Sequence, residues 1–504
     1  MQRLSGLDAS FLYLETPAMH MHVALVAVLD PSTMPGGYDY ERVHHFIDRG
    51  VRTQPQLQRR LVEVPMQIDH PVWLDEPNLD TLHHIRRIAC PAPGTDSQLA
   101  TLVGRIMSSP LDRGRPLWEA WVIEGLEGGR FALVAKVHHA ITDGVAGTQL
   151  LSALFSASPL AEPKQPSEAS REDEALPSEV DLLRDAVLAR IARPKEIVRM
   201  FKRTSNALFE LYERRKNPEH QAGATMFDSP RTRWNGPLSA QRSSGFARVP
   251  LADLKFIRKA FGVSANEVVL GICAGALRGY LEARGELPLA PLIAACPIAT
   301  RVRGQTGNRV SAMVTSLATN LEDPGERLLA IKAITRVAKQ EHDALGGDLI
   351  RSWAELMTPG LVTTAARLYS KYKISELHRP MFNLMISNVP GPRVPIYFAG
   401  AQLVAAYPLG PISEGAGLNI TVMTYAQSVD FGFVTTPSLI DDVDALAARI
   451  PDAARELLRA AERLPPPERP AKESIAPDDA ALDSLPPEAA RPGEVSVQEK
   501  SNAT

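Results

Sequence analysis

Short, almost continuous apolar runs in the first part of the chain predict buried β-strands. Val23–Leu29 is one such run, and Phe131–Val137 is another, interrupted by a single lysine. Runs of this length and composition are typical of strands. A polar turn and a helix-like pattern, Val145–Phe155, follow the second run. This order of strand, loop and helix places residues 138–144 at the exposed end of a strand, where a functional side chain is both rigidly held and accessible.

A change in composition separates a second region from the first. Ala161–Pro177 is rich in Pro, Glu and Ser, which is typical of a linker. Glu179–Lys216 has a helix-like pattern whose second half, residues 195–216, is basic and amphipathic. Such a helix can lie in a lipid interface, and the same pattern also fits a linking helix packed on the protein. We therefore predict an N-terminal domain over residues 1–160 and a helical linker over residues 161–224.

The rest of the chain predicts a second domain and a tail. Asn266–Leu281 has the pattern of a buried helix, while Leu418–Tyr425 and Val429–Val434 have the pattern of two paired strands. These elements define a C-terminal domain over residues 225–465. Residues 466–504 are rich in proline and charge and contain almost no large apolar side chains, so they cannot offset the entropy cost of folding. We expect a disordered tail there.

Composition and charge narrow the class of protein. The 504 residues are 44% hydrophobic, which allows a large core, and the net charge of -3 argues against nucleic-acid binding. The three cysteines, Cys90, Cys273 and Cys296, form no CxxC pair, so neither a zinc knuckle nor a redox motif is predicted. The sequence has no signal-peptide pattern and no apolar stretch of membrane-spanning length. We expect a cytoplasmic protein, with peripheral contact at the inner face of the plasma membrane as an open alternative.

The run from His138 to Gly144 has the form HHxxxDG and carries the candidate chemistry. Histidine is the default base for activating a hydroxyl because its unperturbed pKa lies nearest neutral pH. In this interpretation one histidine points into a cleft, Asp143 folds back to hold the loop, and Gly144 allows a tight junction with the next helix. Two structural histidines at a strand end are the alternative. The pairs His44-His45 and His83-His84 lack Asp-Gly at this spacing, and we interpret them as structural or surface residues.

Other catalytic classes lack support in the sequence. Neighbouring residues on a strand point to opposite faces, so His138 and His139 would seldom share one metal ion, and no HExxH or Cys/His cluster accompanies them. Gly262–Asn266 lacks the second glycine of a GxSxG nucleophile elbow. There is no Walker loop and no GxGxxG after a strand. The sequence thus predicts no metal, no cofactor and no nucleotide-driven step.

Several motifs along the chain resemble, in the same order, those of the bacterial wax ester synthase/diacylglycerol acyltransferase family. The resemblance extends from residue 4 to about residue 463. The motifs that carry it are Leu4–Asp8, Glu15–Pro17, Met21–Val23, Pro116-Leu117-Trp118, Ile123–Leu126, His138–Gly144, Arg233–Pro237, Asn266–Leu270, Ala274–Arg278, Gly307–Ser311, Ser387–Pro392 and Gly417–Ile420. This ordered set is more specific than HHxxxDG alone, which peptide-condensation and chloramphenicol-acetyltransferase-like proteins also carry.

The resemblance implies a fold and a set of site residues. The fold is α/β, with two chloramphenicol-acetyltransferase-like domains of mixed sheets flanked by helices, a helical linker, and an active-site tunnel between the domains. The base is assigned to His139 rather than His138, and Asp143 is assigned a structural role. Gly144 and the Pro116-Leu117-Trp118 motif are expected to shape the loop, the fold or the tunnel wall.

The chain departs from the family at one of these motifs. The family usually has Asn-Asp where this chain has Asn266-Glu267. The asparagine is kept, and Asn266 is the candidate donor to an oxyanion, with helix capping as the alternative. The role of the acid at position 267 stays open at this point.

The activity implied by the resemblance is direct transfer of a long-chain acyl group from acyl-CoA to diacylglycerol or to a long-chain alcohol. Acyl-CoA is then a co-substrate rather than a cofactor, and the scheme needs neither a covalent intermediate nor a metal. The expected partners are these substrates and a membrane or lipid-droplet surface. Two alternatives stay open: condensation of carrier-bound acyl groups, and a non-catalytic lipid-surface protein of the same fold.

Overall fold

The computed structural model describes residues 2–76, 79–141, 154–162, 227–299, 310–345 and 354–465, with short stretches between residues 178 and 205. Most of the predicted helix Val145–Phe155, most of the predicted linker and the predicted tail lie outside these residues. By their contacts, residues 1–464 form one unit and residues 465–504 form another.

Two six-stranded mixed sheets form the framework of the first unit. The first, called the N-terminal sheet below, has the order β12 (Tyr397–Phe398), β13 (Ala401–Leu409), β2 (His22–Asp30), β7 (Phe131–His138), β6 (Trp118–Glu124) and β5 (Ile85–Ala89). The second, called the C-terminal sheet, has the order β10 (Val310–Ser316), β9 (Ile293–Ala299), β11 (Leu384–Pro390), β14 (Leu418–Tyr425), β15 (Ser428–Thr435) and β8 (Ser243–Pro250). A small third sheet has the order β1 (Gln2–Arg3), β4 (Val72–Asp75) and β3 (Arg59–Val62).

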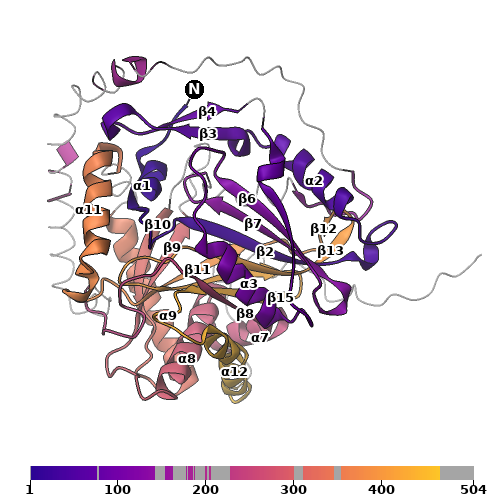
Figure 1. Cartoon of the computed structure of the whole chain (residues 1–504). Helices are drawn as coiled ribbons and strands as arrows, with labels where there is room; N and C mark the ends of the chain where they lie inside the picture. The colour runs from indigo at the N-terminus through magenta and orange to yellow at the C-terminus, as the bar shows by residue number, and fades with distance from the viewer. Residues whose placement is uncertain are drawn as a thin grey trace, which may run out of the picture. The chain divides into compact units, whose positions relative to one another are not determined.

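Helices pack on these sheets, as the α/β prediction requires. They are α1 (Gly6–Leu14), α2 (Tyr40–Arg52), α3 (Asp96–Ser108), α7 (Leu251–Phe261), α8 (Ala265–Glu282), α9 (Pro324–Leu345), α11 (Pro359–Lys371) and α12 (Val443–Glu462). The helices α7, α8 and α12 gather beside the C-terminal sheet (Figure 1). No single described helix is long and apolar enough to cross a membrane, and α7 and α8 meet that test only as a pair bent by 105°.

The strands and the buried helix predicted from apolar runs are confirmed. Val23–Leu29 and Phe131–Val137 lie in β2 and β7, which pair with each other, and the predicted helix Asn266–Leu281 is α8. The two predicted strands near residue 425 are β14 and β15, an antiparallel pair. The lysine that interrupts the second run, Lys136, is fully buried because its ammonium group donates to the carbonyl oxygens of Ile106 and Ser109 at the end of α3.

Reciprocal capping explains where α3 and α8 begin. The Thr95 hydroxyl accepts from the amide of Gln98, and the Gln98 side chain accepts from the amide of Thr95. Ser264 and Glu267 repeat this arrangement at α8, where the amide of Ser264 donates to Glu267 Oε2 at 2.7 Å. The acid at position 267 is therefore a capping residue, and the capping alternative for Asn266 is wrong because Ser264 occupies the cap.

The N-terminal sheet is completed by strands from the far end of the chain. β13 pairs antiparallel with β2, from Gln402 opposite Asp30 to Leu409 opposite Ala24. Because β7 pairs with the other side of β2, that strand is hydrogen-bonded along both edges. Residues 401–409 belong to the predicted C-terminal range, so the sheet is built from both predicted domain ranges. The boundaries near residues 160 and 225 stay a prediction.

A bulge in β13 is tied to the C-terminal sheet by an ion pair between the half-buried Arg248 and the buried Asp430. The pairing of β13 with β2 shifts by one residue at Val404. The Val404 carbonyl oxygen accepts from the guanidinium of Arg248 at 2.5 Å, and the amide of Ala406 donates to Asp430 at 2.8 Å. Arg248 Nε lies 2.8 Å from the fully buried Asp430 carboxylate. The pair thus satisfies backbone groups that the bulge removes from the ladder.

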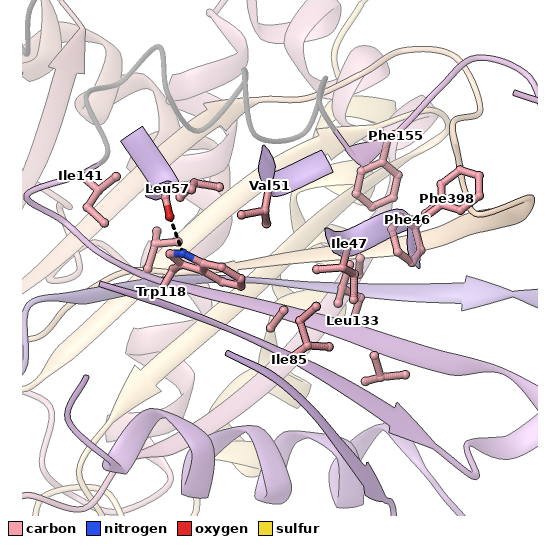
Figure 2. Packing of buried hydrophobic residues seen from close by; sticks show 14 of the residues in the cluster. Phe46, Ile47, Val51, Leu57, Ile85, Trp118, Leu133, Ile141, Phe155 and Phe398 are labelled. Carbon is pink, nitrogen blue, oxygen red and sulfur yellow. Dashed lines mark hydrogen bonds between the residues drawn. The ribbon is translucent and has the colours of Figure 1, made fainter. Parts of the chain in front are cut away.

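Aromatic side chains from both halves of the chain share one apolar core. Phe398 of β12 packs with Phe46 of α2 and with Phe155, at ring-centroid distances of 6.3 and 5.6 Å (Figure 2). The buried indole of Trp118 donates to the carbonyl oxygen of Leu57 at 2.8 Å, the dashed line in Figure 2. Burial of each such side chain contributes on the order of 2 kcal/mol or more.

Replacing Arg248 by Met should destabilise the protein by about 3 kcal/mol, because Asp430 would stay buried without its cation. The measurement is the free energy of unfolding in urea. The control is Arg455→Met, which removes an exposed pair with Asp452 and should cost less than about 1 kcal/mol. Equal losses in the two variants would show that the burial of Asp430 gives the Arg248–Asp430 pair no special role.

Candidate active site

The histidine pair follows the central strand of the N-terminal sheet. β7 lies between β2 and β6, and His138 is its last residue. The His138 amide donates to the carbonyl oxygen of Leu117 at 3.0 Å, and the His139 amide donates to that of Met21 at 2.8 Å. Backbone bonds to both neighbouring strands or their extensions therefore fix the chain where the two histidines leave the sheet.

The buried side chain of His138 is hydrogen-bonded through Nδ1, and its Nε2 faces a carboxylate. Its Nδ1 accepts a hydrogen bond of 3.0 Å from the amide of Ala140. An accepting Nδ1 places the ring proton of neutral His138 on Nε2. That nitrogen lies 3.5 Å from Oε1 of Glu15. His138 is thus tied to its own loop on one side and to a carboxylate on the other, which suits a positioning role.

Glu15 connects several groups around this histidine. Its Oε1 lies 3.3 Å from Nε2 of His22, and its Oε2 accepts from Arg113 at 2.7 Å. Burial by itself raises the pKa of Glu15, but the nearby imidazoles of His138 and His22 and the hydrogen bond from Arg113 outweigh it and hold the pKa well below its usual range. The side chain therefore carries a negative charge under the histidine pair at neutral pH.

His139 has a different environment. Its imidazole stacks on the ring of Phe11 in α1, with a centroid distance of 4.0 Å and an angle of 20°. Burial lowers the pKa of His139 to about 4, and the neighbouring His138 also lowers it. At pH 7 the imidazole is neutral. A neutral imidazole can accept a proton from a hydroxyl, so His139 meets the first requirement of a general base.

The Pro116-Leu117-Trp118 motif lies beside this site as part of the core. Leu117 and Trp118 are buried, and the Leu117 carbonyl is the one that accepts from the His138 amide. His84 stacks on Trp118 at 4.4 Å, and its Nδ1 lies 2.8 Å from the Trp118 carbonyl oxygen. The structural interpretation of this second histidine pair is confirmed for His84.

For three predicted site residues, the described part of the chain shows no contact with His138 or His139. Asp143 and Gly144 lie outside the described residues. Asn266 is half-buried in the first turn of α8, and no contact within the described part of the chain joins it to His138 or His139. Their roles stay predictions.

A cavity of about 970 Å³ reaches this cluster through Glu15 and Arg113, which form part of its wall. Other parts of the wall come from α1, the loop that follows it, β3 and its following loop, the end of α3 and α11. The lining includes apolar side chains such as Leu12 and Val64 and cationic side chains such as Arg367. The cavity is large enough for an acyl chain or a lipid headgroup.

The fold and the paired histidines define a protein of the chloramphenicol-acetyltransferase-like class, and comparisons with known proteins refine this. The family model described as the wax ester synthase/diacylglycerol acyltransferase catalytic domain matches residues 4–269, and the model for the C-terminal domain of that family matches residues 306–458. The chain belongs to the wax ester synthase/diacylglycerol acyltransferase family. It is an acyltransferase.

Individual relatives agree with this assignment. A protein of Mycobacterium tuberculosis, provisionally named a diacylglycerol O-acyltransferase, is 38% identical over 468 residues, which are 92% of each chain. Among solved structures, the wax ester synthase/diacylglycerol acyltransferase of Marinobacter aquaeolei is similar with a TM-score of 0.64 and 26% identity, covering 91% of this chain and 100% of that one. The first condensation domain of the calcium-dependent antibiotic synthetase, at 15% identity and a TM-score of 0.52 over 92% of this chain and 96% of that one, shares the fold.

The sequence did not predict that Glu15, His22 and Arg113 meet beside His138. Glu15 and His22 belong to sequence motifs that carry no predicted role in the site, and Arg113 belongs to none of the motifs. The available signal was the density of polar residues in an otherwise apolar segment, with Glu15, His20 and His22 within eight residues. Arg113 had no comparable signal, because it meets Glu15 across 98 residues of chain.

Replacing Glu15 by Gln should lower the acyl-transfer kcat by about 10- to 100-fold, because the histidine pair loses the charge that orients it. The control is Glu63→Gln. Glu63 lines the same cavity and lies 3.5 Å from Arg113, but no described contact joins it to either histidine. The measurement is kcat together with the melting temperature of each variant. If both variants lose the same activity, the contact with His138 has no part in positioning.

Proposed function

We propose that this acyltransferase moves a long-chain acyl group from acyl-CoA to the hydroxyl of diacylglycerol or of a long-chain alcohol. Membership of the wax ester synthase/diacylglycerol acyltransferase family supports the substrate class. The observation that carries the mechanism is the position of His139, which directly follows the last residue of the central strand and stacks on Phe11. Burial lowers the pKa of His139 to about 4, which favours the neutral imidazole that a base needs.

In the proposed reaction, His139 accepts the proton of the acceptor hydroxyl as the oxygen attacks the thioester carbonyl. A bond forms between that oxygen and the carbonyl carbon, and the resulting oxyanion needs a donor, for which Asn266 is the candidate. The carbon–sulfur bond then breaks. The thiolate of CoA takes the proton held by His139, so the imidazole returns to its neutral form. This scheme uses neither a metal nor a cofactor, and Asp143 shapes the loop.

Two other functions are compatible with the fold. The condensation-domain likeness raises the condensation of carrier-bound acyl groups, but it is a likeness of fold alone. A non-catalytic lipid-surface protein would keep the family motifs without turnover. We also propose a cytoplasmic location, which three buried free cysteines support, with the acceptor supplied from a lipid surface.

Purified protein given palmitoyl-CoA should release CoA when hexadecanol or dioleoylglycerol is supplied in detergent micelles. His139→Ala should lower kcat by about 100- to 10,000-fold, because the general base is lost. The control is His45→Ala, an exposed histidine of another His-His pair, which should retain wild-type activity.

The outcomes separate the candidate functions. No CoA release with either acceptor would overturn the proposed reaction and favour the non-catalytic alternative. Activity only with a carrier-bound acyl donor would favour condensation. Wild-type activity in His139→Ala would leave the reaction class intact and refute the proposed base.

The pH dependence should report the lowered pKa of His139. The base is active when deprotonated, so kcat/KM should stay level from about pH 8 to pH 5 and fall as the pH drops through about 4. An ordinary histidine would give a fall near pH 6.5. Enzyme held at pH 4 and returned to pH 7 before assay controls for denaturation. A fall centred near pH 6.5 would contradict a lowered pKa for His139.

A further inference from the structure

The outer face of α11 carries an apolar stripe. Leu361, Ala365, Leu368 and Tyr372 follow one another at spacings of four, three and four residues, which places them on one side of a helix. Leu361 is 72% exposed, Leu368 45% and Tyr372 63%. A helix on the surface of a protein normally presents polar side chains there, so this pattern is inverted.

Further exposed apolar residues extend this stripe. Leu377, just beyond the end of α11, is 80% exposed. Met66 is 84% exposed and belongs to η3 (Pro65–Gln67), a short helical turn that packs against α11. Isolated apolar residues are common on protein surfaces, but a group of them around one helix marks an interaction site. We call these six residues the α11 face.

Basic residues flank the α11 face. Arg367, Lys371, Lys373 and Arg379 are all exposed, whereas Glu376 is the one exposed acid between residues 357 and 381. Lys371 Nζ lies 5.7 Å from the centre of the Tyr372 ring. Apolar side chains bordered by cations match a bilayer surface that carries anionic headgroups, where each cation contributes about 1 kcal/mol.

The opposite side of the same helix lines the cavity that reaches Glu15. Thr363 and Ser370 lie on that side, and the flanking Arg367 and Lys371 also contribute to the wall. The helix therefore separates the cavity from the exposed stripe, and in Figure 1 it stands at the edge of the molecule next to α1. A bilayer against the stripe would therefore lie on the other side of α11 from the cavity.

We propose that the α11 face docks on the surface of an anionic lipid bilayer and brings the acceptor to the mouth of the cavity. This rests on the proposed function, because a lipid acceptor resides in such a surface. The α11 face is separate from the basic segment 195–216, most of which lies outside the described residues. A second copy of the chain fits the face less well, because a symmetric contact would bring Arg367, Lys371 and Lys373 against the same cations.

The test uses the full chain and the double variant Leu361→Gln/Leu368→Gln. Neither leucine lines the cavity, and glutamine retains a good helix propensity. Binding is measured by co-sedimentation with phosphatidylcholine vesicles containing about one third phosphatidylserine. The double variant should bind at least about tenfold more weakly than wild type. The control Leu289→Gln replaces a leucine that is 99% exposed elsewhere and should bind as wild type does.

A second comparison concerns activity and charge. The double variant should transfer acyl groups to dioleoylglycerol in detergent micelles at the wild-type rate, and to dioleoylglycerol in vesicles at least about tenfold more slowly.

Lys373→Gln/Arg379→Gln should weaken binding to the anionic vesicles and leave binding to pure phosphatidylcholine vesicles unchanged.

Three results would overturn the proposal. The first is wild-type vesicle binding by the leucine double variant. The second is a change of that variant from dimer to monomer in sedimentation velocity with vesicle binding intact, which would make the α11 face a contact between copies. The third is a large fall in melting temperature, which would mean that another part of the chain covers the stripe. Absence of transfer in micelles by the wild type would refute the proposed function alone, since vesicle binding still tests the docking.

Discussion

The pairing of β13 with β2 is the interaction on which the rest of the N-terminal sheet depends. Without β13, β2 would be an edge strand with a row of unsatisfied backbone groups. With it, β2 supports β7 from one side while β6 supports it from the other. The strand that ends in His138 is therefore held by residues more than 250 positions away in the chain, and the Arg248–Asp430 pair fastens β13 to the second sheet at its bulge.

This rigid frame lets two adjacent histidines differ. His138 accepts from the Ala140 amide and faces Glu15, and the negative charge of Glu15 is stabilised by His22 and Arg113. His139 stacks on Phe11 and is kept neutral by burial. His138 therefore suits a positioning role, and His139 offers a basic nitrogen. Adjacent strand-end residues diverge in this way because their side chains leave the backbone in opposite directions.

Glu15 and Arg113 connect the surroundings of the histidines with the cavity. Glu15 and Arg113 belong both to the surroundings of His138 and to the wall of the cavity, and α11 forms another part of that wall. A helix with a polar side toward a cavity and an apolar side toward solvent is suited to a boundary between two phases. Acyl transfer to a lipid needs such a boundary, because the donor acyl-CoA is charged and the acceptor is insoluble.

Local patterns in the sequence determined β2, β7, α8 and the β14–β15 hairpin, because apolar periodicity reports burial without knowledge of the partner. The Ser264–Glu267 cap also follows a local pattern, a serine three residues before a glutamate at the start of an apolar run. The helix-capping alternative for Asn266 overlooked this pattern. Ordered motifs determined the family. Only the tertiary structure revealed that β13 completes the first sheet and that Glu15 meets His138, His22 and Arg113. Those contacts join residues distant in the chain, and packing rather than local periodicity decides which distant side chains meet.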